Sequence, residues 1–309
     1  MPWSHHSHSG QFCKHAVGSL EDVVKEAIRK GFEVYGLTEH APRYRTEDLY
    51  PEEASLTPDH LAAQFDAFLD EAHRLKNLYS SQIRLLVGVE TEYITELDLD
   101  GVERLLQRHS GRIEYLVGSV HHVNGTPIDF DEATFRKAES EAGSTNAFLV
   151  AYFEAQYDML QRLRPEVVGH FDLCRLYTPS LRFADYPDAL ELAKRNIMFA
   201  IGYGALFEVN AAALRKNWDT PYPGPDILEI ILAHGGRLAL SDDSHGPHAV
   251  GLNYGRLPEY LHQAGVRELW TLDACEAANT VARGMVKPVR TKGDWQAHAF
   301  WAQFTSVHG

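Results

Sequence analysis

Histidine and carboxylate side chains are the groups in this sequence that suggest chemistry. The chain contains 17 histidines, and several follow short apolar runs that are typical of β-strands. Imidazole nitrogens and carboxylate oxygens are common ligands of divalent metal ions. The candidate segments are His6-Ser7-His8, His15, Glu39-His40, Glu90, His121-His122, His170 and Asp242-Asp243-Ser244-His245. They predict a metal site if the fold brings them together.

The spacing within two segments favours shared ligation. His6 and His8 lie two residues apart, so an extended backbone places both imidazoles on one side, and Asp243 and His245 repeat this spacing. Alone, the first motif also fits a tag remnant or a solvated polar stretch, and the second also fits a polar turn. A lone histidine at a strand end is more often structural. Seven histidines and two acids at successive strand ends favour a site for several metal ions.

The elements that must position these residues alternate along the chain. We expect strands near 2–7, 34–38, 84–89, 115–120, 167–169, 205–209, 237–240 and 268–272. We expect helices near 19–31, 57–79, 102–108, 146–164, 186–196 and 224–234, the first capped by Ser19 and Asp22 and the second by Thr57-Pro58. Seven or eight such strand–helix units are more than most open sheets contain. The predicted fold is therefore α/β, a distorted TIM-like (β/α)7-8 barrel and a single domain over 1–309, in which the loops after the strands converge on one face.

The overall composition narrows the class of partner. Twenty-nine basic and 43 acidic residues give a net charge of −14, which opposes binding to nucleic acid or anionic membranes. No apolar run approaches the roughly 20 residues that span a bilayer, and the first residues do not resemble a signal peptide. With only Cys13, Cys174 and Cys275, we expect free thiols in a reducing cytoplasm. The predicted partner is a small molecule.

The ordered set of motifs resembles the signature segments of the polymerase and histidinol phosphatase (PHP) family. These segments are His6-Ser7-His8-Ser9, Gly36-Leu37-Thr38-Glu39-His40-Ala41-Pro42, Gly118-Ser119-Val120-His121, Val168-Gly169-His170-Phe171-Asp172-Leu173 and Ser241-Asp242-Asp243-Ser244-His245 with Val250-Gly251. They span about residues 4–255 in the family's order, and they match the histidinol phosphatase branch best. The resemblance implies a barrel with three divalent ions, for which zinc, manganese and iron are all candidates.

The resemblance also implies roles for single residues. The first ion is held by His6, His8, Glu90 and Asp243. Glu90 bridges to the second ion, which His121 and His170 complete, and the third ion is held by His15, His40 and His245. The implied catalytic residues are Glu90, Asp243 and His245, and the implied substrate-binding residues are Arg43, His122, Arg175, Asn210 and Arg215. For the arginines, an ordinary surface charge is the alternative.

Two features depart from the family pattern. The stretch from His8 to His15 is one residue longer than usual, and the usual Ser-Asp-Ala-His motif contains a second aspartate. The Asp-x-His spacing favours Asp243 as the ligand, with Asp242 as the alternative.

The resemblance implies hydrolysis of L-histidinol phosphate in histidine biosynthesis. Bound metals would activate water and neutralise the phosphate. Glu39, Asp129, Asp172 or Glu208 are candidates to recognise the cationic end of this substrate. The alternatives are a PHP enzyme for another phosphomonoester or a nucleotide, an amidohydrolase or deaminase, and a non-catalytic PHP module. Glu90 in the bridging position argues against the amidohydrolase, and the complete ligand set argues against the non-catalytic module.

Overall fold

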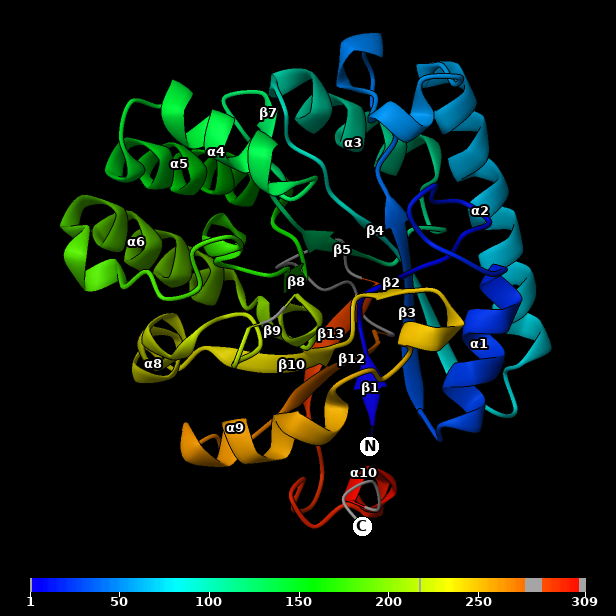
Figure 1. Cartoon of the computed structure of the whole chain (residues 1–309). Coiled ribbons are helices and arrows are strands. Elements are labelled where there is room, and N and C mark those ends of the chain that lie inside the picture. Colours follow the sequence, from blue (N-terminus) through cyan, green and yellow to red (C-terminus); the bar gives the residue numbers. More distant parts are fainter. Residues whose placement is uncertain (1, 217, 276–284, 306–309) are drawn as a thin grey trace.

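Seven parallel strands form the central sheet. The computed structural model describes residues 2–216, 218–275 and 285–305 (Figure 1). In pairing order the strands are β1 (Trp3–Ser4), β3 (Val34–His40), β4 (Arg84–Glu90), β5 (Tyr115–Gly118), β8 (Val167–Val168), β9 (Leu206–Asn210) and β10 (Arg237–Ser241). Every neighbouring pair runs parallel, as the alternation of strands and helices predicts.

Helices surround this sheet (Figure 1). They are α1 (Leu20–Arg29), α2 (Pro58–Leu78), α3 (Glu96–Arg108), α4 (Glu132–Glu141), α5 (Thr145–Leu163), α6 (Pro187–Tyr203), α7 (Ala212–Arg215), α8 (Pro225–Ala233), α9 (Leu257–Gln263) and α10 (Ala302–Thr305). The predicted caps of the first two are confirmed, since the Ser19 hydroxyl accepts from the Asp22 amide and Thr57 caps a helix with Pro58 in its first turn. None of the described helices is long and apolar enough to cross a membrane.

A short two-stranded sheet closes the barrel between the edge strands β1 and β10. β2 (Ser7–His8) follows β1, β11 (Ser244–His245) follows β10, and the two pair in parallel. We call the contact between the two ends of the barrel, formed by β1–β2 and β10–β11, the barrel seam. Asp242 strengthens it, because its amide donates to Ser4 Oγ and its carboxylate accepts from the Ser4 hydroxyl at 2.8 Å. The predicted distorted barrel is thus confirmed, with seven strands in its main sheet.

Two glycines allow a tyrosine to cross the barrel interior. A Cβ atom at Gly36 of β3 would overlap the Tyr115 hydroxyl, and one at Gly88 of β4 would crowd the Tyr115 ring. The Tyr115 hydroxyl donates to the His5 carbonyl at 2.8 Å. The glycines therefore let Tyr115 support the N-terminal segment that carries the first two predicted ligands.

Several elements differ from the prediction. The strand expected near 268–272 exists as β12 (Trp270–Ala274), but it pairs antiparallel with β13 (Val286–Arg290) and lies outside the parallel sheet. The hairpin of β6 (His122–Val123) and β7 (Thr126–Pro127) was not predicted. Nor was α4, which buries only Phe135 and Ala138 and so has little apolar periodicity. α3 starts early because Thr95 caps it, and α6 continues to Gly204, whose φ of 89° ends it.

Candidate metal centre

The predicted ligands meet at the carboxyl ends of the strands. His8, His40 and Glu90 end β2, β3 and β4, while Asp243 lies between β10 and β11. Four overlapping groups of possible ligand atoms contain all nine predicted metal ligands, namely His6, His8, His15, His40, Glu90, His121, His170, Asp243 and His245. His6 and His8 are fully buried, so the solvated polar stretch is excluded as an explanation of their motif.

Glu90 lies at the centre of the cluster. Its Oε1 atom is 3.1 Å from the Nε2 atoms of His6, His121 and His170. Its Oε2 atom is 3.2 Å from His8 Nε2 and 3.1 Å from His40 Nδ1. Because these imidazoles belong to all three predicted ion positions, Glu90 is placed to bridge cations.

Imidazole nitrogens approach one another in pairs across the cluster. The Nε2 atoms of His6 and His8 are 3.1 Å apart, and those of His121 and His170 and of His15 and His40 are 3.3 Å apart. Lone pairs at this distance repel unless a proton or a cation lies between them. Nitrogen ligands of a tetrahedral metal with bonds of about 2.0–2.1 Å lie roughly 3.3–3.4 Å apart. The donor atoms and their separations therefore fit divalent metal ions.

Burial and neighbouring charges shift the pKa values of the clustered side chains. Burial alone would raise the pKa of Glu90, but the charges of His6, His121 and His40 outweigh it and hold the pKa well below its ordinary value. Burial opposes a charged His6, yet Glu90, Asp243 and Glu208 raise the pKa of His6 well above its ordinary value. Burial and the neighbouring His8 lower the pKa of His40 to about 3. Glu90 is thus held as a carboxylate that attracts positive charge, whereas burial and His8 disfavour protonation of His40.

Buried carboxylates orient the imidazoles from behind. Glu208 Oε2 lies 3.2 Å from His6 Nδ1, and Glu39 Oε2 lies 3.4 Å from His8 Nδ1. Glu92, which was not predicted, lies 3.3 Å from His121 Nδ1. A carboxylate at Nδ1 leaves Nε2 free to face a metal. Glu39 and Glu208 therefore act on the histidines rather than at the substrate pocket.

The two neighbouring aspartates face different surroundings. Asp243 Oδ1 lies 3.7 Å from the Nε2 atoms of His6 and His8 and 3.6 Å from His245 Nδ1. Asp242 points into the barrel seam, where its Oδ2 atom accepts from the Tyr35 hydroxyl and the Gly251 amide. The geometry favours Asp243 as the ligand. The extended backbone from which this was predicted is wrong, since Asp243 has a φ of 45°.

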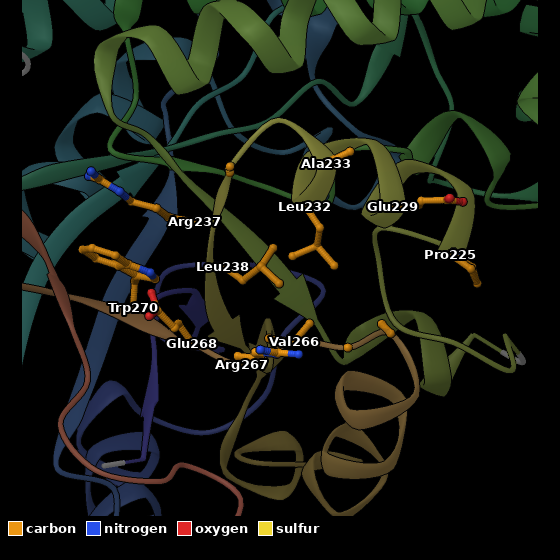
Figure 2. Close-up of a pocket in the computed structure, with 14 residues that line it drawn as sticks. Pro225, Glu229, Leu232, Ala233, Arg237, Leu238, Val266, Arg267, Glu268 and Trp270 are labelled. Carbon is orange, nitrogen blue, oxygen red and sulfur yellow. The ribbon is translucent and has the colours of Figure 1, made fainter.

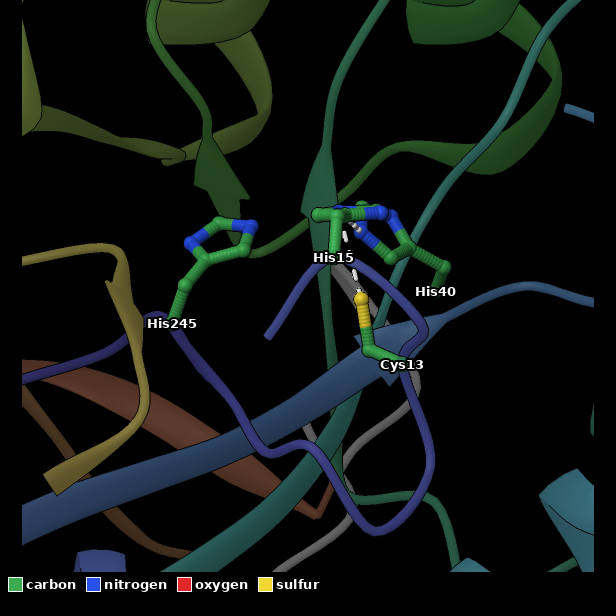
Figure 3. Close-up of side chains that lie close together, drawn as sticks. All are labelled: Cys13, His15, His40 and His245. Carbon is green, nitrogen blue, oxygen red and sulfur yellow. Dashed lines mark hydrogen bonds between the residues drawn. The ribbon is translucent and has the colours of Figure 1, made fainter. Parts of the chain in front are cut away.

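A cysteine joins the histidines expected at the third ion (Figure 3). Cys13 Sγ lies 3.2 Å from His15 Nε2. The ligand atoms of Cys13, His15, His40 and His245 all lie within 4.8 Å of one another. The sequence predicts only a free thiol here, and the available signal was the position of Cys13 two residues before His15.

A pocket of about 490 Å³ opens over this cluster. Arg215 and Lys216 contribute cationic side chains to its lining, and Glu52 and Asp129 contribute carboxylates. Tyr50, Phe130 and Tyr222 are its aromatic residues. Of the predicted substrate-binding residues, Arg215 lines the pocket, and Asn210 donates to Asp243 Oδ2 at 3.3 Å.

The other predicted substrate-binding residues do not line this pocket. Arg43 pairs with Glu53 and lies 4.6 Å from the centre of the Tyr50 ring, which His122 stacks against. Arg175 pairs with Asp172 and Asp226. Neither arginine is the surface charge considered as the alternative, because each is 3% exposed. Asp172 forms its ion pair with Arg175. Of the four carboxylates suggested for the cationic end of the substrate, Asp129 alone lines the pocket.

A larger cavity of about 830 Å³ lies at the opposite end of β10 (Figure 2). Its lining includes Arg237 and Leu238 at the amino end of that strand, and Arg237 lies 4.5 Å from the centre of the Trp270 ring. Neither histidine nor cysteine is among the residues that line it. Cavity size therefore does not identify the reactive site in this protein.

The fold agrees with comparisons to known proteins. Residues 4–212 match the PHP domain family. The chain belongs to this family. Over its whole length it is 46% identical to a Schizosaccharomyces pombe protein named probable histidinol-phosphatase, of which it covers 99%. It is 34% identical to the histidinol-phosphatase of Saccharomyces cerevisiae, over 84% of this chain and 87% of that protein.

A solved PHP structure supports the shared fold. The histidinol phosphate phosphatase of Lactococcus lactis, crystallised with zinc, L-histidinol and phosphate, matches with a TM-score of 0.63 at 18% identity. The match covers 87% of this chain and 96% of that one. Zinc is thus bound by a protein with this fold, and the clusters of histidine, glutamate and aspartate in this chain are suited to metals.

Proposed function

We propose that this chain is a metal-dependent phosphomonoesterase that hydrolyses L-histidinol phosphate to L-histidinol and phosphate in histidine biosynthesis, with residues 1–309 forming one domain. The relative that is 46% identical over the whole chain is named a probable histidinol-phosphatase. The structural observation that carries the proposal is Glu90, whose two oxygens lie 3.1–3.2 Å from imidazoles of all three predicted ion positions beneath a pocket. This arrangement suits a multinuclear phosphatase.

The proposed centre holds three divalent ions, with zinc, manganese and iron as candidates. The ligands would be His6, His8, Glu90 and Asp243 for one ion, Glu90, His121 and His170 for the next, and His15, His40 and His245 for the third. When bound, such ions supply Lewis-acid stabilisation of phosphoryl oxygens and an activated water. Glu90, Asp243 and His245 are the proposed catalytic residues because they lie between or beside these positions at the pocket.

The pocket lining matches the two ends of the proposed substrate. Arg215 and Lys216 offer positive charge to the phosphate in a protein whose net charge is −14. Asp129 offers a carboxylate to the ammonium or imidazole group. Contacts made to this remote end would orient the phosphate over the metal positions. Tyr50, supported from behind by Arg43 and His122, gives that part of the pocket a fixed aromatic wall.

The test is a panel of phosphomonoesters assayed on protein whose metal content is measured in the same sample. We expect L-histidinol phosphate to exceed p-nitrophenyl phosphate in kcat/KM by at least about tenfold, which corresponds to roughly 1.4 kcal/mol. Removal of the metal should abolish both activities. Equal or faster turnover of unrelated phosphomonoesters or of a nucleotide would refute the assignment of L-histidinol phosphate as substrate. The chain would then be a PHP phosphoesterase of different specificity.

A further inference from the structure

We propose that Cys13 is a thiolate ligand of the third metal position, which becomes a site of one sulfur and three imidazoles. This inference rests on the metal centre proposed above and adds a ligand to it. The other three groups of possible ligands each contain a carboxylate, from Glu90 or Asp243. In the group with His15, His40 and His245, Cys13 is the one side chain that can become an anion. A thiolate would therefore supply the negative charge that this group otherwise lacks.

Two separations between the donor atoms are close to those of a tetrahedral site. Bonds of about 2.3 Å to sulfur and 2.0–2.1 Å to nitrogen place neighbouring donors roughly 3.3–3.6 Å apart. Cys13 Sγ lies 3.2 Å from His15 Nε2, which lies 3.3 Å from His40 Nε2. Figure 3 shows the thiol directed at the His15 and His40 rings, with the His245 ring on the other side of the same space.

The loop that carries Cys13 is held in place. The amides of Phe12 and Cys13 both donate to the Ser9 carbonyl, at 3.1 and 2.9 Å. The amide and hydroxyl of Ser9 in turn donate to Glu39 Oε1 at 2.8 and 2.9 Å. The Phe12 ring packs edge-on against Phe68. Cys13 is only 5% exposed, and in the structure its thiol already faces the histidines.

A sulfur ligand gives the third position its own chemistry. The other groups offer nitrogen and oxygen donors, which manganese and iron accept readily, whereas thiolate favours zinc and other softer ions. Binding would release the thiol proton to solvent. The third position should therefore retain zinc when the other positions exchange their metals.

Cobalt(II) substitution tests the ligand directly, because thiolate bound to cobalt produces a near-ultraviolet charge-transfer band that imidazole and carboxylate do not. We expect this band in cobalt-loaded full-length protein and its loss in Cys13→Ser. The affinity for the last ion bound should fall by roughly tenfold or more in that variant. Cys174 and Cys275 lie outside the described metal groups, so the variant with both changed to serine keeps Cys13 alone and should retain the band. This control makes the test independent of how well Cys13→Ser folds.

The outcomes separate the two proposals. Protein that binds about three cobalt ions without the band would show that Cys13 only hydrogen-bonds to His15, and the thiolate assignment would be overturned while the metal centre stands. Persistence of the band in Cys13→Ser, or its loss in the control, would also overturn it. Failure to bind cobalt or zinc at all would overturn both the thiolate ligand and the metal centre of the proposed function.

Discussion

The adjacent aspartates of the barrel seam offer a matched pair of substitutions. Asp243→Asn keeps the shape of the side chain and tolerates the φ of 45°, since asparagine adopts the left-handed region readily. It removes the negative charge that faces His6, His8 and His245 at 3.6–3.7 Å. We expect kcat/KM to fall by about 10²–10³-fold, or roughly 3–4 kcal/mol, together with a loss of bound metal.

Asp242→Asn should have the opposite character. An amide oxygen can replace Oδ2 and accept from Tyr35 and Gly251, and the amide NH₂ can donate to Ser4 Oγ. Ser4 can then direct its own hydroxyl to the His6 carbonyl, 3.3 Å away. Every hydrogen bond of the seam thus finds a substitute. We expect metal content like that of the wild type and kcat/KM within about threefold of it.

The pH dependence of stability gives this pair a second readout. Burial raises the pKa of Asp242 from 3.8 to about 6, against the hydrogen bonds from Gly251, Ser4 and Tyr35. The folded state therefore favours the neutral acid, and this stabilisation is complete below about pH 4 and is lost as the pH rises through 6. The difference is roughly 3 kcal/mol. Asp242→Asn has no proton to lose there, so its free energy of unfolding should fall less than that of the wild type between pH 4 and pH 7.

The assays are phosphate release, elemental analysis and denaturant unfolding, on both variants and the wild type. Greater loss of rate or metal in Asp242→Asn than in Asp243→Asn would refute the reasoning and move the ligand to Asp242. An unchanged pH dependence of unfolding in Asp242→Asn would show that another group titrates in that range.

Three further predictions concern the metals and the pocket. Glu90→Gln should remove at least one ion per chain and lower kcat/KM by about 10³-fold or more. The control is Glu166→Gln: Glu166 is a buried carboxylate that accepts from the Leu116 amide, and elemental analysis of this variant should show the metal content of the wild type. A chelator should lower the melting temperature, because a metal ion at a thousandfold excess over its Kd adds about 4 kcal/mol to the free energy of unfolding. Calorimetry before and after the metal is restored measures the fall in melting temperature and its recovery. Arg215→Ala should raise KM for the phosphate substrate at little cost in stability, whereas Arg175→Ala should destabilise by about 3–5 kcal/mol in denaturant unfolding because it leaves Asp172 buried without its partner.

Local sequence patterns predict much of this fold for physical reasons. The capping box of Ser19 and Asp22 and the start of α2 depend on residues within one turn, so they can be recognised without the tertiary structure. The convergence of His8, His40 and Glu90 follows from parallel strands alone. The hydrophobic alternation cannot reveal that β12 pairs with β13, because strand direction depends on a partner later in the chain.

The site could be predicted where roles follow strand ends, and not where they depend on distant partners. Arg43 and Arg175 follow the motif segments, as residues of the pocket would, but they pair in the interior with Glu53 and Asp172. Arg215 lines the pocket from the short helix that follows β9. The role of Cys13 was missed because its loop has no periodicity; its position two residues before His15 was the one local signal, and the packing of the loop shows that the thiol faces the histidines.

Barrel closure and the candidate metal centre depend on the same residues. His8 and His245 are register partners in the β2–β11 pair that closes the barrel, and both belong to the candidate ligand groups. Closure therefore brings imidazoles and carboxylates from the two ends of the barrel into one buried space. The Nε2 atoms of His6 and His8, only 3.1 Å apart within the first segment, repel each other unless a proton or a cation lies between them. Ions bound there would cross-link the first and last segments of the barrel, so their binding free energy would stabilise the closed fold as well as serve catalysis.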